Sequence, residues 1–199
     1  KFNNETFSGN GALQALSQKG IQLFNEQGIP TVKHEEWKYT RISGVLNKDF
    51  SYAADATAVT TADVDAFRLP GNETANELVF INGIYHAELS TIRSSADELV
   101  ILPLSEAVKG EYKSIIDSNL GHSAKYHTDG INAMNNVFAY QGLFLAVKKN
   151  KVVEHPLYCY YINDARSGSV LSQPRTLMHV GVNAEVYLVC LLYTSPSPR

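Results

Sequence analysis

The feature that most constrains the fold is a change from helical to strand-like hydrophobic patterning at Leu143. Before it, apolar residues recur at helical spacing in two stretches, 12–24 and 104–116, with polar residues between them. An α+β chain is predicted, in which a helical and α/β N-terminal region precedes a β region. Spacing alone leaves a sandwich, a barrel and a β-helix open. The later segments are rich in Val, Leu and Tyr and are separated by polar or Pro-containing turns: 143–147, 151–154, 157–162, 176–182 and 185–188.

Turn-forming residues mark the ends of several elements in the first half of the chain. The helix over 12–24 is expected to end at Gly28 and Pro30. Residues 47–77 have weak apolar periodicity, which predicts a linker with one short helical turn near 61–67.

The strongest local signal is the Asn82-Gly83 pair between the β-forming runs 78–81 and 84–89. Asn and Gly tolerate the positive φ angles of a type I′ turn, so the pair predicts a β-hairpin. Residues 99–102 form a further strand candidate.

The composition is typical of a folded chain. Hydrophobic residues make up 44% of the 199 positions and charged residues 19%, which excludes a largely disordered chain. The 17 Lys and Arg residues are scattered among 20 Asp and Glu residues, so we expect no nucleic-acid partner. No apolar run approaches the roughly 20 residues of a membrane helix, so we expect no membrane contact. Cys159 and Cys190 lie outside metal-ligand spacing, and a reducing, cytoplasmic location is expected.

Two histidine-containing segments could be interpreted as metal sites. His34 begins a sequence like the zinc-binding His-Glu-x-x-His helix, but Lys38 occupies the position of the second His, so the motif fails. His122, His127 and Asp129 lie close together in a Gly-flanked segment, where ordinary surface residues are the favoured interpretation. We therefore expect no metal ligands among them.

Nucleophilic and acid/base chemistry also lack a defined pattern. Cys159 follows His155 by four positions, which on a strand separates the two side chains by about 13 Å and prevents direct thiol activation. We interpret Cys159 as a small buried apolar side chain. Three carboxylates leave an acid/base dyad conceivable without indicating one: Glu154, Asp164 and Glu185. Three basic residues are expected to form a solvated turn: Lys148, Lys149 and Lys151.

The last ten residues, 190–199, break the β pattern by passing from an apolar run into Ser- and Pro-rich sequence. They resemble the translated read-through of a sequencing adaptor. We therefore expect a non-native tail and a longer natural protein, with a natural disordered terminus as the alternative.

A long and specific motif lies in the N-terminal third. It reads Gly28-Ile29-Pro30-Thr31 and then Lys33-His34-Glu35-Glu36-Trp37-Lys38-Tyr39-Thr40. With later segments that fall in the same order, it resembles the SufB/SufD family of the SUF iron–sulfur cluster assembly system. The Glu-Glu-Trp-Lys-Tyr-Thr signature favours the SufD branch. Physically, we expect Trp37 and Tyr39 to pack as bulky anchors.

The resemblance implies a helical and α/β region over 1–125, followed over 126–189 by the first coils of a right-handed parallel β-helix. It also implies a non-catalytic subunit that pairs with a SufB-like protein and binds a SufC-like ATPase through segments beyond Val189. The iron–sulfur assembly intermediate would form on the full complex. No family site residue can be carried onto this chain, so no catalytic, cofactor-binding or metal-binding residue is assigned.

Two other readings of the chain are possible. A β-helical carbohydrate-active enzyme would need carboxylate, Arg or His groups converging on one strand face. A thiol enzyme using Cys159 would need a lowered thiol pKa. In addition, a β-helix that stops after its first coils exposes apolar surface and unpaired backbone, so we expect the 199-residue chain to aggregate or to be unstable.

Overall fold

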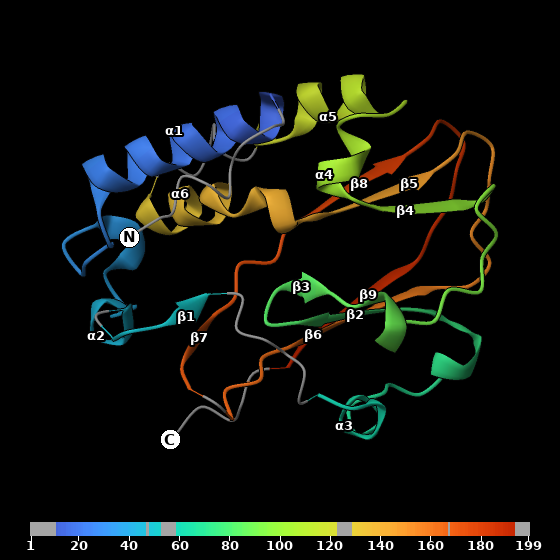
Figure 1. The fold of residues 1–199 in the computed structure, drawn as a ribbon, viewed down its shortest axis with the longest axis horizontal. Helices are drawn as coiled ribbons and strands as arrows, with labels where there is room; N and C mark the ends of the chain where they lie inside the picture. Colours follow the sequence, from blue (N-terminus) through green and yellow to red (C-terminus); the bar gives the residue numbers. More distant parts are fainter. Residues whose placement is uncertain (1–10, 47, 53–58, 123–128, 167, 194–199) are drawn as a thin grey trace. The chain divides into compact units, whose positions relative to one another are not determined.

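The computed structural model describes residues 11–46, 48–52, 59–122, 129–166 and 168–193 (Figure 1). The chain forms two compact units, each built from two separate stretches. The helical unit comprises 1–50 and 103–142, and the β unit comprises 51–102 and 143–199. The domain boundary expected between residues 125 and 126 lies outside the described residues.

The helical unit contains both α-helices and single 3-10 turns. Its described elements are α1 Gly11–Gln27, η2 Glu35–Trp37, α2 Ser43–Leu46, α4 Leu104–Ala107, α5 Lys113–Asn119, α6 Gly130–Val137 and η6 Ala139–Gln141.

Helix α1 ends where the sequence predicts. Gly28 adopts a φ of 64°, and its N–H donates to the Phe24 carbonyl at 2.8 Å. Glycine commonly follows the last turn of a helix in the left-handed conformation, because it has no Cβ that would clash in that conformation. The predicted end of this helix is therefore confirmed.

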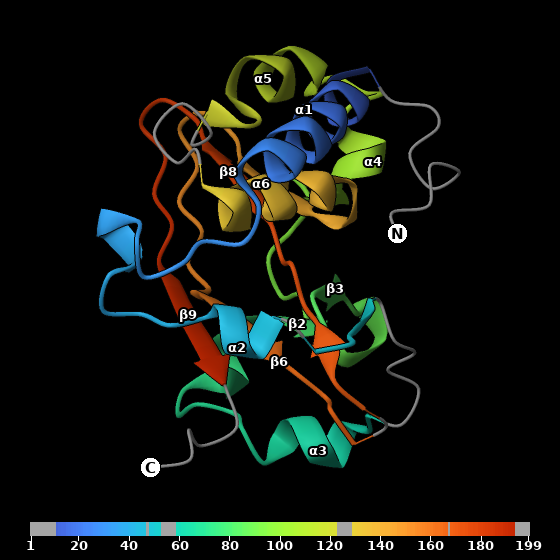
Figure 2. The ribbon, with the colours of Figure 1, turned by 90° about the vertical axis from the view of Figure 1, so that its left-hand side faces the viewer.

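Helices α1 and α6 pack side by side (Figure 2). Gly20 of α1 permits the close approach, since a Cβ there would lie 2.7 Å from the Ala133 carbonyl oxygen. Helix α6 was not expected from the sequence. Asp129 caps it, accepting hydrogen bonds from the N–H groups of Ile131 and Asn132 at 2.8 and 3.1 Å.

The second predicted helix, over 104–116, is divided. Helix α4 ends at Ala107, a turn around Gly110 follows, and α5 begins at Lys113. Glycine weakens a helix by about 1 kcal/mol relative to alanine, so a break at this position has a physical cause.

The β unit contains short strands joined by turns. Its described elements are β1 Ser51–Tyr52, α3 Thr61–Asp65, η3 Asn72–Thr74, β2 Asn76–Ile81, β3 Ile84–Tyr85, η4 Ala87–Leu89, β4 Leu99–Pro103, β5 Leu143–Val147, β6 Leu157–Ile162, β7 Val170–Leu171, β8 Thr176–Val180 and β9 Leu188–Tyr193. The strand order is β3-β2-β6-β9 in one sheet and β4-β5-β8 in another, and β1 pairs with β7.

Successive strands stack in parallel register. Leu143 of β5 lies opposite Thr176 of β8, 33 residues later, and Leu157 of β6 lies opposite Leu188 of β9, 31 residues later. Strand β2 pairs with β6 in the same parallel sense. The chain therefore makes two stacked passes over 143–193, and the fold is α+β as predicted.

The turns between these strands also stack. Asn150 and Asn183 occupy equivalent positions with φ of 61° and 56°, and the Asn183 amide donates to Asn150 Oδ1 at 3.1 Å. The backbone joins the same two turns, because Asn150 N–H donates to the Val182 carbonyl at 3.0 Å. Asparagine tolerates this left-handed conformation better than most residues, which explains its presence in both turns.

Alternate residues of the strands face the main core of the β unit, and the intervening residues face a smaller core beneath α3. The main core includes Leu78, Phe80, Leu143, Leu145, Val147, Leu157 and Cys159. The smaller core includes Val64, Val79, Ile81, Tyr160 and Ile162. Burial on both faces is typical of parallel strands and explains their continuous apolar runs.

The predicted hairpin at Asn82-Gly83 is confirmed, with φ of 53° and 87° at the two turn residues. Its second strand is shorter than the expected 84–89. Strand β3 ends at Tyr85 because backbone groups nearer the start of β2, at Val79 and Glu77, bind residues 90–91 instead of a longer β3. The Val79 N–H donates to Ser90 Oγ at 2.9 Å, and Glu77 exchanges backbone hydrogen bonds with Thr91.

Three other strand boundaries differ from the prediction. The segment 151–154 is reduced to a single parallel bridge between Val152 and Glu185, because the stacked turns occupy this corner. Strand β8 ends at Val180, where Gly181 enters the next turn. The segment expected at 185–188 is replaced by β9, which begins at Leu188.

Candidate functional site

The residues considered as metal ligands do not form a metal site within the described ranges. His122 is exposed, the Asp129 carboxylate is occupied as the cap of α6, and His127 lies outside the described residues. His34 is also exposed, and the Thr31 N–H donates to its Nδ1 at 3.1 Å. The segment after His34 forms only the 3-10 turn η2.

Cys159 lies in the main core of the β unit and is 4% exposed. Burial raises the pKa of its thiol to about 12, so the neutral thiol predominates at physiological pH. Its interpretation as a small apolar side chain is confirmed. A catalytic thiolate requires a shift in the opposite direction, so the thiol-enzyme alternative loses support.

The three carboxylates of the β region lie in different environments. Asp164 accepts hydrogen bonds from the Arg166 guanidinium at 2.8 and 3.0 Å, which hold the pKa of its carboxyl below the usual range. Glu154 and Glu185 are exposed, and a hydrogen bond to Glu185 raises the pKa of Tyr187. Within the described part of the chain, no hydrogen bond joins two of these carboxylates, so the carbohydrate-enzyme alternative is not favoured.

The lysine-rich turn is solvent-exposed, as predicted. Lys148 lies 3.5 Å from Asp97, and Lys151 pairs with the same carboxylate. Hydrogen bonds from Lys151 and Lys148 lower the pKa of Asp97. Exposed ion pairs of this kind contribute little to the free energy of folding, so these contacts give the turn little added stability.

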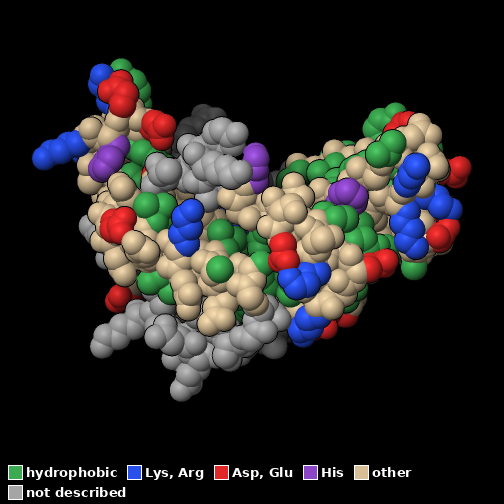
Figure 3. All heavy atoms as spheres, turned by 90° about the horizontal axis from the view of Figure 1, so that it is seen from above, with side chains coloured by type: hydrophobic (Ala, Val, Ile, Leu, Met, Phe, Trp, Pro, Cys, Tyr) green, Lys and Arg blue, Asp and Glu red, His purple; other side chains and the backbone are tan. Residues whose placement is uncertain are grey.

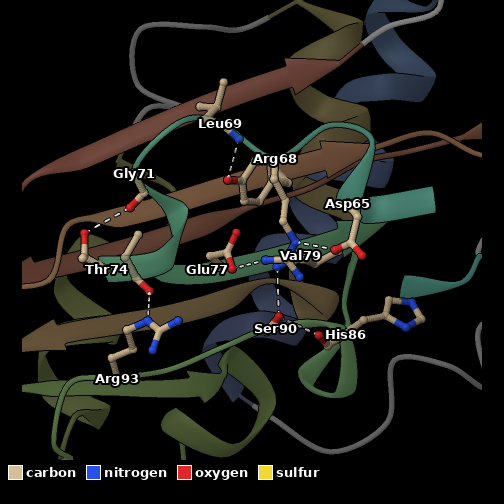
Figure 4. Close-up of polar contacts among 12 residues, drawn as sticks. Asp65, Arg68, Leu69, Gly71, Thr74, Glu77, Val79, His86, Ser90 and Arg93 are labelled. Atoms are coloured by element: carbon tan, nitrogen blue, oxygen red, sulfur yellow. Dashed lines mark hydrogen bonds and ion pairs between the residues drawn. The ribbon is translucent and has the colours of Figure 1, made fainter. Parts of the chain in front are cut away.

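The most deeply buried charged cluster was not identified from the sequence. Glu77 of β2 is 2% exposed and pairs through Oε2 with Arg68 Nη1 (Figure 4). Arg68 also donates from Nε to Asp65 Oδ1 at 2.7 Å. The sequence signal for this cluster is the single Glu immediately before the apolar run 78–81.

Tyr160 of β6 extends the cluster. Its hydroxyl accepts a hydrogen bond from the Leu69 N–H at 3.2 Å. Burial raises the pKa of Tyr160, the Leu69 hydrogen bond lowers it, and the nearby Glu77 charge raises it again. The Tyr160 phenol and the Glu77 carboxylate therefore lie near each other in the β unit.

The chemistry of the cluster fits a structural role and not a catalytic one. Burial disfavours the charged form of Arg68, but hydrogen bonds to Asp65 and Glu77 outweigh that effect and raise its pKa. An arginine that stays protonated cannot act as a general base, and its partner carboxylate is shielded from solvent. We infer that the cluster holds the segment after α3 against the outer face of β2 and β6.

The expectation that Tyr39 packs as an anchor is wrong. Tyr39 is 91% exposed, with Lys38 Nζ 5.6 Å from its ring centroid, and Trp37 is half-buried. The turn is held by local backbone bonds, including Trp37 N–H to the His34 carbonyl at 2.9 Å. Because these bonds connect near neighbours, they fix the turn without requiring its aromatic side chains to reach a core.

The surface agrees with the mixed charge of the sequence. On the face in Figure 3, Lys and Arg side chains stand beside Asp and Glu side chains, also where blue side chains gather at the right-hand end. None of the helices in the described part combines the length and the apolar character needed to cross a membrane.

Comparisons with known proteins identify the relatives of the chain. The family model described as SufBD protein N-terminal region matches residues 7–159. "Iron-sulfur cluster assembly protein SufD" of Escherichia coli (strain K12) is 25% identical over 166 residues, which cover 82% of this chain. The same alignment covers 35% of the E. coli protein, so the chain spans about a third of the length of this curated relative.

Proposed function

Because the chain belongs to the SufBD N-terminal-region family, we propose that it is part of a SufD-like subunit of an iron–sulfur cluster assembly system. The family match over residues 7–159 is the observation that carries this proposal, since it includes most of both units. The similarity to a protein named for iron–sulfur cluster assembly supports the same assignment.

The proposed role is that of a scaffold acting on protein partners, without catalysis by this chain. The subunit would pair with a SufB-like protein and bind a SufC-like ATPase, and the nascent cluster would be carried by the full complex as its product. The chemical character of the described residues is compatible with this role. Cys159 is a protonated core thiol, and Arg68 and Glu77 form an ion pair within the fold.

The proposed architecture of the β unit is the start of a right-handed parallel β-helix. Support comes from the parallel pairing of β5 with β8 and β6 with β9, and from the repeat of 31 to 33 residues between their partners. The hydrogen bond between Asn150 and Asn183 supports coil stacking at the turn. Each coil of such a solenoid covers the previous one, so its strands bury apolar side chains between neighbours.

A chimera tests the functional proposal. Residues 7–159 would replace the aligned segment of the E. coli SufD protein, and the chimera would be expressed in a strain that lacks SufD. We expect it to restore the activity of an iron–sulfur enzyme in extracts and to co-purify with the SufB and SufC proteins of the host.

Two matched variants make the outcome decisive. A chimera with Leu78→Asp should fail, because a charge would be buried at a fully buried core position. A chimera with Val45→Thr, at an exposed position, should work as well as the parent. A chimera that accumulates in folded form but neither restores the enzyme nor binds the host proteins would refute the proposal.

A further inference from the structure

We draw no further inference here: the strongest candidate, the exposed turn over residues 31–41 of the helical unit with Tyr39 91% exposed, carries no proposal because nothing in the structure shows what covers it.

Discussion

Replacing Arg68 with methionine should destabilise the β unit far more than its partly exposed position implies. The Arg68 side chain is 18% exposed, while the side chain of its partner Glu77 is 2% exposed. Methionine keeps much of the aliphatic volume of arginine and removes the charge. The substitution therefore leaves the Glu77 carboxylate buried without its cation.

The expected magnitude follows from the burial of the pair. Removing one partner of a buried ion pair costs about 3–5 kcal/mol, because the remaining charge is uncompensated. Glu77→Gln should cost less, about 1–3 kcal/mol, since Arg68 keeps its bond to Asp65. Asp65→Asn is the surface control: the Asp65 side chain is 57% exposed, so its loss should cost less than about 1 kcal/mol.

The double variant Arg68→Met/Glu77→Met provides the sharpest contrast. It removes both charges and fills the site with apolar side chains of similar length, which often recovers or exceeds the stability of the original pair. We therefore expect the double variant to be more stable than Arg68→Met alone. A double-mutant cycle that uses the single variants Arg68→Met and Glu77→Met then gives the coupling energy directly.

Native-state hydrogen exchange of peptides covering β2 is the appropriate assay, because it reports the opening free energy of the β unit separately from the helical unit. Two outcomes would refute the reasoning. One is an Arg68→Met variant that loses no more protection than Asp65→Asn. The other is a double variant that is as unstable as Arg68→Met, which would show that lost packing rather than the isolated charge causes the effect.

Three further predictions concern other parts of the chain. Gly20→Ala should destabilise the helical unit by about 1–3 kcal/mol, because the added Cβ would collide with the α6 backbone. The control Gly44→Ala, whose Cβ would meet open space, should stabilise the unit by about 0.5–1 kcal/mol. Equal effects of the two substitutions on urea unfolding, followed by circular dichroism, would contradict this prediction. Iodoacetamide at pH 8 should alkylate exposed Cys190 and spare buried Cys159, whose pKa of about 12 keeps its thiol protonated until strongly alkaline pH. Equal labelling of both thiols in mass spectrometry would contradict the burial of Cys159. Leu188→Lys should reduce self-association of the 199-residue chain, because Leu188 is 51% exposed on β9, the edge strand of its described sheet, and a charged edge opposes strand pairing. A parent chain that is monodisperse by light scattering would contradict the premise of this prediction.

The elements that were predictable from the sequence are those that depend on near neighbours. Gly28 ended α1 because a left-handed residue closes a helix through a bond four residues back. The Asn82-Gly83 turn and the short helix α3 formed for comparable reasons. In α3, the Thr60 hydroxyl accepts from the Asp63 N–H, while the Asp63 carboxylate accepts from the Thr60 N–H.

The candidate site was less predictable because burial there depends on distant segments. Glu77 precedes an apolar run, but its burial requires α3 to pack on one face of β2 and β6 to pair alongside it. The size of Tyr39 predicts that it packs as an anchor, and the structure exposes it because the hydrogen bonds of its turn join near neighbours. Aromatic size predicts an average burial and does not identify the surface that a particular ring contacts.

The sequence by itself determined where α1 ends, where the hairpin turns, that 78–81, 143–147 and 157–162 are strands, and which family the residues resemble. The tertiary structure alone decided that Asn76 pairs with Leu157, 81 residues later, and that Arg68 forms an ion pair with Glu77. The physical reason is that backbone torsion preferences act over a few residues and can be read locally. Parallel pairing and charge burial depend on which distant surfaces meet, and single residues do not specify that choice.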